Sequence, residues 1–353
     1  MRRNQLPPHK SATYVMPRWR AVYVSVPKAA CTSLKWLIAD LQGESRERFY
    51  SSLSREATRA MCVHRRSLWR DTPMLHTLPA DELAEISPEN GWFVFAVVRH
   101  PAARLWSAWQ SKFLLQEPWF MEQYGGAPWA EHRVPQSTQE VVEDFHRFAR
   151  SVAEDPDQPV MKNRHFMAQT ALLAVDRMPY SRVYATHEMP RLLDDLTAHL
   201  RAHRWQGERL TLERRNETPL RPMPDAFPED IQDGLRKLYA ADYDRFRFTD
   251  VLPGGLERSE SYTEDALNEV ARLVERAERL GDVAVRAQRL SAELAQTRRQ
   301  LAAATGSAPA PARAAVGRPA AGAVEARVRE VARRLPQPVR ARLRGVGSML
   351  RGS

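Results

Sequence analysis

The feature that most constrains this chain is an apolar strand that runs through a turn without glycine into a helix. Residues 20–42 have the sequence RAVYVSVPKAACTSLKWLIADLQ, in which the apolar run Ala21–Val26 ends at Pro27. We expect Thr32 or Ser33 to cap the helix that follows. Apolar side chains then recur at helical spacing, at Leu34, Leu37, Ile38 and Leu41. The segment predicts a buried strand, a loop and an amphipathic helix.

A second unit of the same kind predicts an α/β fold. In residues 91–115, GWFVFAVVRHP is expected to form an apolar strand that ends at Arg99, and AARLWSAWQSKFLL a helix. Apolar strands that alternate with helices are typical of a parallel sheet covered on both faces, the three-layer α/β class. Further elements are expected as helices at 138–153, 188–203 and 229–246 and as a short strand at 182–185.

The composition changes after the sequence Leu-Pro-Gly-Gly at 252–255. From Tyr262 to Ala303, Leu, Val and Ala recur among Glu and Arg, which predicts a long amphipathic helix or coiled coil, and with it a surface for homo-oligomers. A stretch rich in Ala, Pro and Gly follows, as in disordered linkers, and the chain closes with a basic amphipathic segment. We divide the chain into an N-terminal extension (1–17), a main domain (18–252), the long helix (260–303), the linker (304–323) and the tail (324–353).

The net charge of +10 is unevenly placed. From Thr305 to the end, ten arginines stand against two glutamates, a balance of +8, so that residues 1–304 carry about +2. A main domain so close to neutrality lacks the basic stripe of a duplex DNA binder, and we expect no nucleic-acid partner. The simplest interpretation of the tail is a solvated segment. The alternative is a peripheral contact with anionic lipid at the inner membrane face.

Cysteine usage and hydropathy favour a cytoplasmic protein. Cys31 and Cys62 allow at most one disulfide and cannot form a metal cage alone, so we expect two free thiols. The segment MRRNQLPPHKSATYVMPRW at 1–19 lacks the apolar run of a signal peptide. No stretch approaches the roughly 20 apolar residues of a membrane span.

The loop VPKAACTSLK, residues 26–35, is a candidate phosphate site. Unpaired backbone N–H groups and the positive end of the helix dipole suit an anion, and Lys28 adds a full charge. Thr32 and Ser33 add hydroxyl donors. The glycines of GxxxxGK[ST] are missing, so this is not a Walker A loop. Because any strand followed by a capped helix offers part of this pattern, a purely structural role for the loop alone is an equal alternative.

A second candidate anion site is the sequence VVRHPAARLWSAW at 97–109. Arg99 stands at the carboxyl end of an apolar strand, where α/β sheets place their ligand crevice. Ser107 lies about two helical turns further on, so that both side chains could reach one anion. The alternative is that Arg99 pairs with a carboxylate and Ser107 faces solvent.

Together the two segments resemble the binding motifs of carbohydrate sulfotransferases of the chondroitin 4-O-sulfotransferase and HNK-1 sulfotransferase type. In that family VPKxACTxxK binds the 5′-phosphosulfate of 3′-phosphoadenosine 5′-phosphosulfate (PAPS), and RxPxxRLxSAY binds its 3′-phosphate. Trp109 stands here where the family usually has Tyr. Weaker similarity covers RHFMAQTALL at 164–173, SRVYATHE at 181–188 and LYAADYDRFRF at 238–248, so the resemblance spans about residues 18–250.

The resemblance implies a bacterial sulfotransferase of P-loop-like fold that moves a sulfuryl group from PAPS to a hydroxyl of a carbohydrate or glycosylated acceptor. No metal is expected, because a lysine can stabilise the leaving phosphate. The residues implied at the 5′-phosphosulfate are Lys28, Ala29, Ala30, Cys31, Thr32 and Ser33, and those at the 3′-phosphate are Arg99 and Ser107.

The catalytic residues implied are Lys28 at the leaving group and a histidine as general base. His64, between the two motifs, is the first candidate, and His165, in the segment 164–173, is the second. Cys31 at the helix start is expected to pack, a thiol enzyme being the alternative.

Two other functions are compatible with part of the pattern. A nucleotide-dependent kinase shares the strand–loop–helix phosphate site but needs Walker glycines and a magnesium-binding aspartate, which the loop lacks. A coiled-coil or membrane-surface adaptor would need only a degenerate nucleotide fold. Neither should prefer a ligand with a 3′-phosphate, so binding of 3′-phosphoadenosine 5′-phosphate (PAP) separates them from a sulfotransferase.

Overall fold

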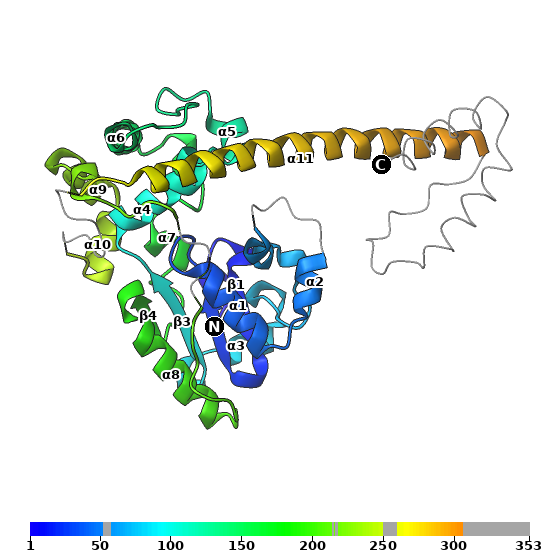
Figure 1. The fold of residues 1–353 in the computed structure, drawn as a ribbon. Helices are drawn as coiled ribbons and strands as arrows, with labels where there is room; N and C mark the ends of the chain where they lie inside the picture. The colour runs from blue at the N-terminus through cyan, green and yellow to red at the C-terminus, as the bar shows by residue number, and fades with distance from the viewer. Residues whose placement is uncertain (52–57, 214, 216–217, 250–259, 306–353) are drawn as a thin grey trace. The chain divides into compact units, whose positions relative to one another are not determined.

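The computed structural model describes residues 1–51, 58–213, 215, 218–249 and 260–305 (Figure 1). Its four strands are β1 (Thr13–Met16), β2 (Ala21–Val24), β3 (Phe93–Val98) and β4 (Arg182–Ala185). The α-helices are α1 (Cys31–Leu41), α2 (Arg46–Ser51), α3 (Ala80–Glu85), α4 (Pro101–Trp109), α5 (Pro118–Tyr124), α6 (Thr138–Glu154), α7 (Gln169–Leu173), α8 (Met189–Ala202), α9 (Glu229–Leu238), α10 (Ala240–Phe246) and α11 (Glu264–Thr305).

The four strands form one sheet in the order β1-β2-β3-β4. Strands β2, β3 and β4 are parallel, whereas β1 pairs antiparallel with β2 along the sheet edge. This edge strand lies within residues 1–17, which the sequence suggested only as an extension. Because the parallel strands end at one edge, the residues that follow them, among them Lys28, Arg99 and Glu188, leave the sheet on the same side.

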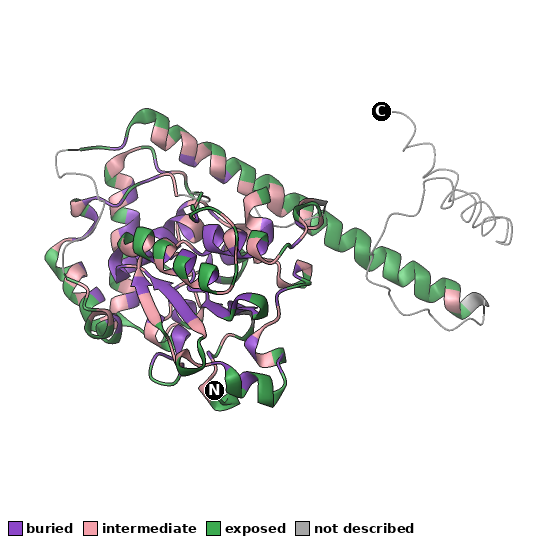
Figure 2. Cartoon of the chain, turned by 90° about the horizontal axis from the view of Figure 1, so that it is seen from below, coloured by how far each residue is buried: buried purple, intermediate pink, exposed green. Residues whose placement is uncertain are grey.

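The expected α/β class with a central, mainly parallel sheet and a long C-terminal helix is confirmed. Strands β1 and β2 are buried throughout and β3 almost throughout, whereas the edge strand β4 is mostly half-buried, so the arrows of Figure 2 are purple and pink. One hydrophobic core joins the sheet to α1 and α8, with Trp36 and Leu196 among its buried side chains. A second core joins α4, α6 and α9 to the beginning of α11, around Trp106 and Phe145.

Two expected helices differ in the structure. The helix expected at 229–246 is broken at Tyr239, whose hydroxyl donates to the carbonyl of Phe166 at 2.7 Å and ties the break to a distant segment. The helix that begins at Pro101 changes after Trp109 into a π-helical turn over Gln110–Leu114. No proline or glycine at either place predicts the change from the sequence. The break and the π-helical turn both depend on tertiary contacts.

The C-terminal part of the chain is one continuous helix as far as it is described. The chain divides into two compact units, residues 1–287 and 288–353, and α11 spans the boundary. The expected tail at 324–353 and nearly all of the expected linker lie outside the described residues. In the described part of the chain, no helix has both the length and the apolar character needed to cross a membrane.

Candidate active site

The loop between β2 and α1 has an unusual backbone. Lys28 and Ala30 adopt left-handed conformations, with φ of +68° and +56°, which cost non-glycine residues roughly 1 kcal/mol or more each. Ala30 is the N-cap of α1, and no side chain caps the helix. The expected capping role of Thr32 or Ser33 is therefore wrong. The chain instead turns sharply into α1 and leaves the first N–H groups of the helix without a capping side chain.

The loop residues are largely enclosed. Ala29, Cys31, Thr32 and Ser33 are buried, and Cys31 and Cys62 are both free thiols, as expected. The hydroxyl of Ser33 accepts a hydrogen bond from the backbone N–H of Arg215 at 3.1 Å, which attaches a later segment to the loop.

Lys28 lies in an environment that disfavours its charge. Its pKa is lowered to about 7, chiefly by burial and then by the positive charge of Lys112, with smaller contributions from Arg99 and Arg104 and an opposing effect of Cys31. An anion bound at this place would reverse that effect and restore the charge of the lysine.

Arg99 connects the second motif, residues 97–109, with the loop of the first motif, residues 26–35. Its guanidinium donates to the carbonyl oxygen of Lys28 at 3.4 Å, directly from the end of β3. Burial and the neighbouring Arg104 lower the pKa of Arg99 from its usual value. Ser107 is buried on α4, two turns from the strand end, and its hydroxyl makes no hydrogen bond within the described residues. His100, the next residue, has Nε2 at 2.8 Å from the carbonyl oxygen of Thr249.

Arg104 is a residue whose role the sequence did not reveal. It is only 2% exposed, and its three nitrogens donate to the carbonyls of Pro27 at 3.1 Å, Met167 at 2.8 Å and Arg164 at 3.0 Å. The side chain thereby ties the phosphate loop to the segment that carries His165. In the sequence it is the second arginine of the motif RxPxxRLxSAY, and it stands in a largely apolar helix, where a buried arginine requires several acceptors.

His64 lies against the beginning of α1. Its Nε2 is 2.9 Å from the hydroxyl of Thr32, and its Nδ1 is 3.0 Å from the ammonium of Lys35. Burial lowers the pKa of His64 well below 6.5, and Lys35 and Arg164 add to the shift. Both ring nitrogens are thus engaged by groups of this chain.

His165 is also close to Lys112, Arg164 and Lys28. Its Nδ1 is 2.8 Å from Oδ1 of Asn163, and the ring meets Phe120 edge-on. Burial lowers the pKa of His165 well below 6.5, and the charges of Lys112, Arg164 and Lys28 contribute. The structure therefore brings both predicted histidines within electrostatic reach of Lys28.

Lys112 is a second residue that the sequence did not indicate. Its charge lowers the pKa of Lys28, His64 and His165, so it lies near all three. It lies on the π-helical turn after α4, with its ammonium 4.6 Å from the centre of the Phe120 ring. π-Helical turns are frequent at functional sites, but α-helical spacing gives no sign of one.

Comparison with known proteins agrees with this geometry. Residues 11–249 match the model of the sulfotransferase family. The chain belongs to that family. Neither a curated protein nor a solved structure matches this sulfotransferase.

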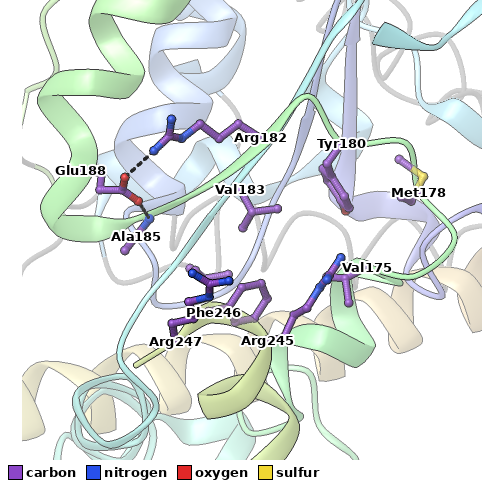
Figure 3. Close-up of a pocket in the computed structure, with 11 residues that line it drawn as sticks. Val175, Met178, Tyr180, Arg182, Val183, Ala185, Glu188, Arg245, Phe246 and Arg247 are labelled. Atoms are coloured by element: carbon purple, nitrogen blue, oxygen red, sulfur yellow. Dashed lines mark hydrogen bonds and ion pairs between the residues drawn. The ribbon is translucent and has the colours of Figure 1, made fainter. Parts of the chain in front are cut away.

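A cavity lies along the edge strand β4 of the sulfotransferase, from Tyr180 before the strand to Glu188 after it, and reaches the carboxyl end of β3 (Figure 3). It measures about 350 Å³, and Val98, the residue before Arg99, lines it. Arg182 on β4 donates to Glu188 at 2.8 Å, and Arg245 and Arg247 of the α10 segment lie opposite. Within the described residues, Arg245 and Arg247 have no carboxylate partner.

The described residues of the sulfotransferase contain no group of three or more His, Cys, Asp or Glu side chains that could hold a metal ion. The charged groups near Lys28 are cations. The arrangement can therefore bind an anion and stabilise negative charge that develops on it.

Proposed function

We propose that this sulfotransferase moves a sulfuryl group from PAPS to a hydroxyl of a carbohydrate or glycosylated acceptor. The observation that carries the proposal is the contact of the two motifs, the Arg99 guanidinium on the carbonyl of Lys28. In the described residues Lys28, Arg99 and Arg164 form no ion pair with a carboxylate. Uncompensated cations beside an uncapped helix N-terminus suit a ligand with more than one anionic group, as PAPS is.

The parts of the site fit the parts of such a ligand. The loop from Lys28 to Ser33 suits the 5′-phosphosulfate, and Arg99 with Ser107 suits the 3′-phosphate. The cavity beside Val98 has the size of a small-ligand pocket, and Tyr180 and Phe246 on its wall offer aromatic surface for a purine. We place the nucleoside there.

The transfer needs in-line placement, stabilisation of the leaving phosphate and a base. PAPS supplies an activated sulfur, whose bond to the phosphate oxygen breaks as a bond to the acceptor oxygen forms. Lys28 stabilises the charge that develops on the leaving phosphate, with no metal required. A histidine takes the proton of the acceptor hydroxyl.

The hydrogen bonds favour His165 as that base. Oδ1 of Asn163 also accepts the backbone N–H of His165 at 3.1 Å, so the amide oxygen is the acceptor and Nδ1 of the ring carries the proton. Nε2 then has its lone pair available, and the low pKa keeps the ring neutral near pH 7. A base oriented from behind by a second group is the usual arrangement in catalysis.

His64, the first candidate from the sequence, fits a positioning role. An ammonium has only protons to give, so Lys35 donates to Nδ1 and the ring proton lies on Nε2. That proton is donated to the Thr32 hydroxyl, so the hydroxyl donates its own proton elsewhere. Its acceptor here is Sδ of Met61 at 4.0 Å, a weak acceptor that an oxygen of the phosphosulfate would replace. We propose that Lys35 and His64 orient Thr32 as a donor to the phosphosulfate.

We also propose a class of acceptor and a cellular compartment. A carbohydrate acceptor is supported by the motif resemblance alone, and we place it beside His165, Lys112 and Phe120. A reducing, cytoplasmic compartment is supported by the two free cysteines. Screening cell extracts with labelled PAPS would identify the acceptor.

Titration calorimetry tests the donor site directly. We expect PAP to bind at least about tenfold more tightly than adenosine 5′-phosphate, because one charge-assisted phosphate contact is worth roughly 1.5–3 kcal/mol. Equal affinities would contradict the 3′-phosphate site and with it the use of PAPS.

A further inference from the structure

Helix α11 packs on the rest of residues 1–287 along one line of its surface. Val270 and Val274 are 0% and 2% exposed, and a side chain at Gly281 would meet Pro118 at 3.2 Å. At about 100° of rotation per residue, positions 270, 274 and 281 lie within about 40° of one another around the helix axis. These residues define the packed face of α11.

A second apolar line lies on the opposite side of the same helix. Its large side chains are exposed: Val283 is 65%, Leu290 58%, Leu294 51% and Leu301 38% exposed. Counted from Gly281, these four fall about 180–220° around the axis. The only exposed large hydrophobic side chains off this line in the described residues are Trp119 and Val285. Much of α11 beyond the packed face is accordingly green in Figure 2.

The exposed line has the spacing of a coiled coil. Leucines and alanine recur every seven residues at 280, 287, 294 and 301, and a second row three residues later contains Val283, Leu290 and Thr297. A seven-residue repeat of this kind keeps one face of the helix toward a partner helix. Each apolar side chain on that face then packs among four side chains of the partner helix. We propose that residues 280–301 pair with the same residues of a second copy of this chain, as a parallel two-stranded coiled coil.

The charges beside this seam favour a second copy in parallel register. Glu293 directly precedes Leu294 of the first row, and Arg298 directly follows Thr297 of the second row. In a parallel two-stranded coiled coil, a residue at the first of these positions lies beside the residue five positions later in the partner helix. Glu293 of each copy would therefore lie beside Arg298 of the other. The antiparallel register that keeps Leu290, Leu294 and Leu301 in the seam would instead bring the two Glu293 carboxylates together.

The oligomeric state of the full chain tests the proposal. Light scattering after size-exclusion chromatography should give twice the mass of one chain. The double variant Leu290→Lys/Leu294→Lys should weaken the dimer by at least about a hundredfold, because each buried leucine contributes roughly 1.5–3 kcal/mol. Val285→Lys is the matched control: Val285 is 47% exposed on the same helix but lies on the other side of it, and this variant should stay dimeric.

A cysteine in the seam tests the direction. Thr297→Cys should form a disulfide between copies under mild oxidation, because parallel pairing places the two positions within disulfide reach. A monomeric full chain, or a dimer that persists in the double lysine variant, would overturn the proposal. A dimer without the Thr297→Cys disulfide would overturn the parallel register. Binding of PAP is measured on the same variants and should be unchanged. A failure of the dimer proposal can therefore be told apart from a failure of the proposed PAPS site.

Discussion

The side chain of Gln169 holds the main chain of Arg99 from both directions: its Oε1 accepts the Arg99 N–H at 2.9 Å, and its Nε2 donates to the Arg99 carbonyl at 2.8 Å. Asp242 fixes Gln169 in turn, with Oδ2 accepting the Gln169 N–H at 2.8 Å. The carboxylate is fully buried and also accepts from Thr170. The main chain of Arg99 is therefore fixed by two residues that lie outside the proposed phosphate sites.

Substitution of Gln169 should lower the affinity for PAP, although Gln169 is not placed in contact with the nucleotide. In Gln169→Ala two hydrogen bonds to the Arg99 backbone are lost, worth about 1 kcal/mol each, so PAP affinity should fall by up to about thirtyfold. Titration calorimetry measures the affinity, and a thermal melt shows whether the variant is folded. A folded Gln169→Ala with unchanged PAP affinity would show that Arg99 does not depend on this support.

The residues placed at the two phosphates should respond differently. Arg99→Ala and Ser107→Ala should weaken PAP binding, by about tenfold to a hundredfold for the arginine, while Lys28→Ala should lower turnover in addition to PAP affinity. Arg209→Ala, on the exposed surface, is the control and should change neither. Normal PAP affinity in Arg99→Ala would remove the 3′-phosphate assignment.

The two histidines should separate into a base and a positioning residue. His165→Ala should bind PAP normally and lose roughly a hundredfold to ten-thousandfold in turnover, the usual share of a general base. His64→Ala should weaken PAP binding and retain more of its turnover. Since burial holds the pKa of His165 well below 6.5, the acid limb of the kcat/KM profile should lie well below pH 6.5. A collapse of turnover in His64→Ala with near-normal His165→Ala would reverse the two roles.

Lys28 should make PAP binding depend on pH above neutrality. In the free protein its pKa is lowered to about 7, chiefly by burial, so the side chain loses its charge as the pH rises through 7. Binding of an anion restores the charge and must then take up a proton. Affinity should therefore fall between pH 7 and 9, by up to about tenfold per pH unit. Calorimetry in buffers of different ionisation enthalpy measures the proton uptake, and Lys28→Met should abolish both effects.

Removal of residues 306–353 should leave sulfuryl transfer to a soluble acceptor intact. The family match ends at residue 249, and every residue assigned to the site precedes that position. The measurement is the transfer of label from PAPS by the shortened chain. Loss of PAP binding on truncation would show that these residues belong to the active domain.

Local patterns predicted the parts of the fold that depend on local sequence. The apolar runs before Lys28 and Arg99 indicated β2, β3 and their helices, because burial alone decides those strands. The antiparallel strand Thr13–Met16 was missed, since its pairing with β2 is set by packing across the sheet edge. The left-handed Ala30 was missed for a related reason: no glycine marks the turn, and the surrounding structure imposes the conformation.

The candidate site residues also divide into those that local sequence predicts and those that depend on tertiary contacts. Lys28 and Arg99 were predicted because their motifs are contiguous and follow strands. Arg104 and Lys112 were missed because their roles depend on which carbonyls and which rings the fold brings near them. The roles proposed for His64 and His165 rest on single hydrogen bonds to Lys35 and Asn163, which sequence order does not encode.

The chain Arg99–Gln169–Asp242 also fixes when the site can form during synthesis. Gln169 is 70 residues from Arg99, and Asp242 is another 73 residues further on. A nascent chain that has exposed both phosphate motifs still lacks the carboxylate that holds Gln169 in place. Contacts of such long sequence separation form late in folding. The donor site of a growing chain should thus remain unable to bind nucleotide until α10 has left the ribosome.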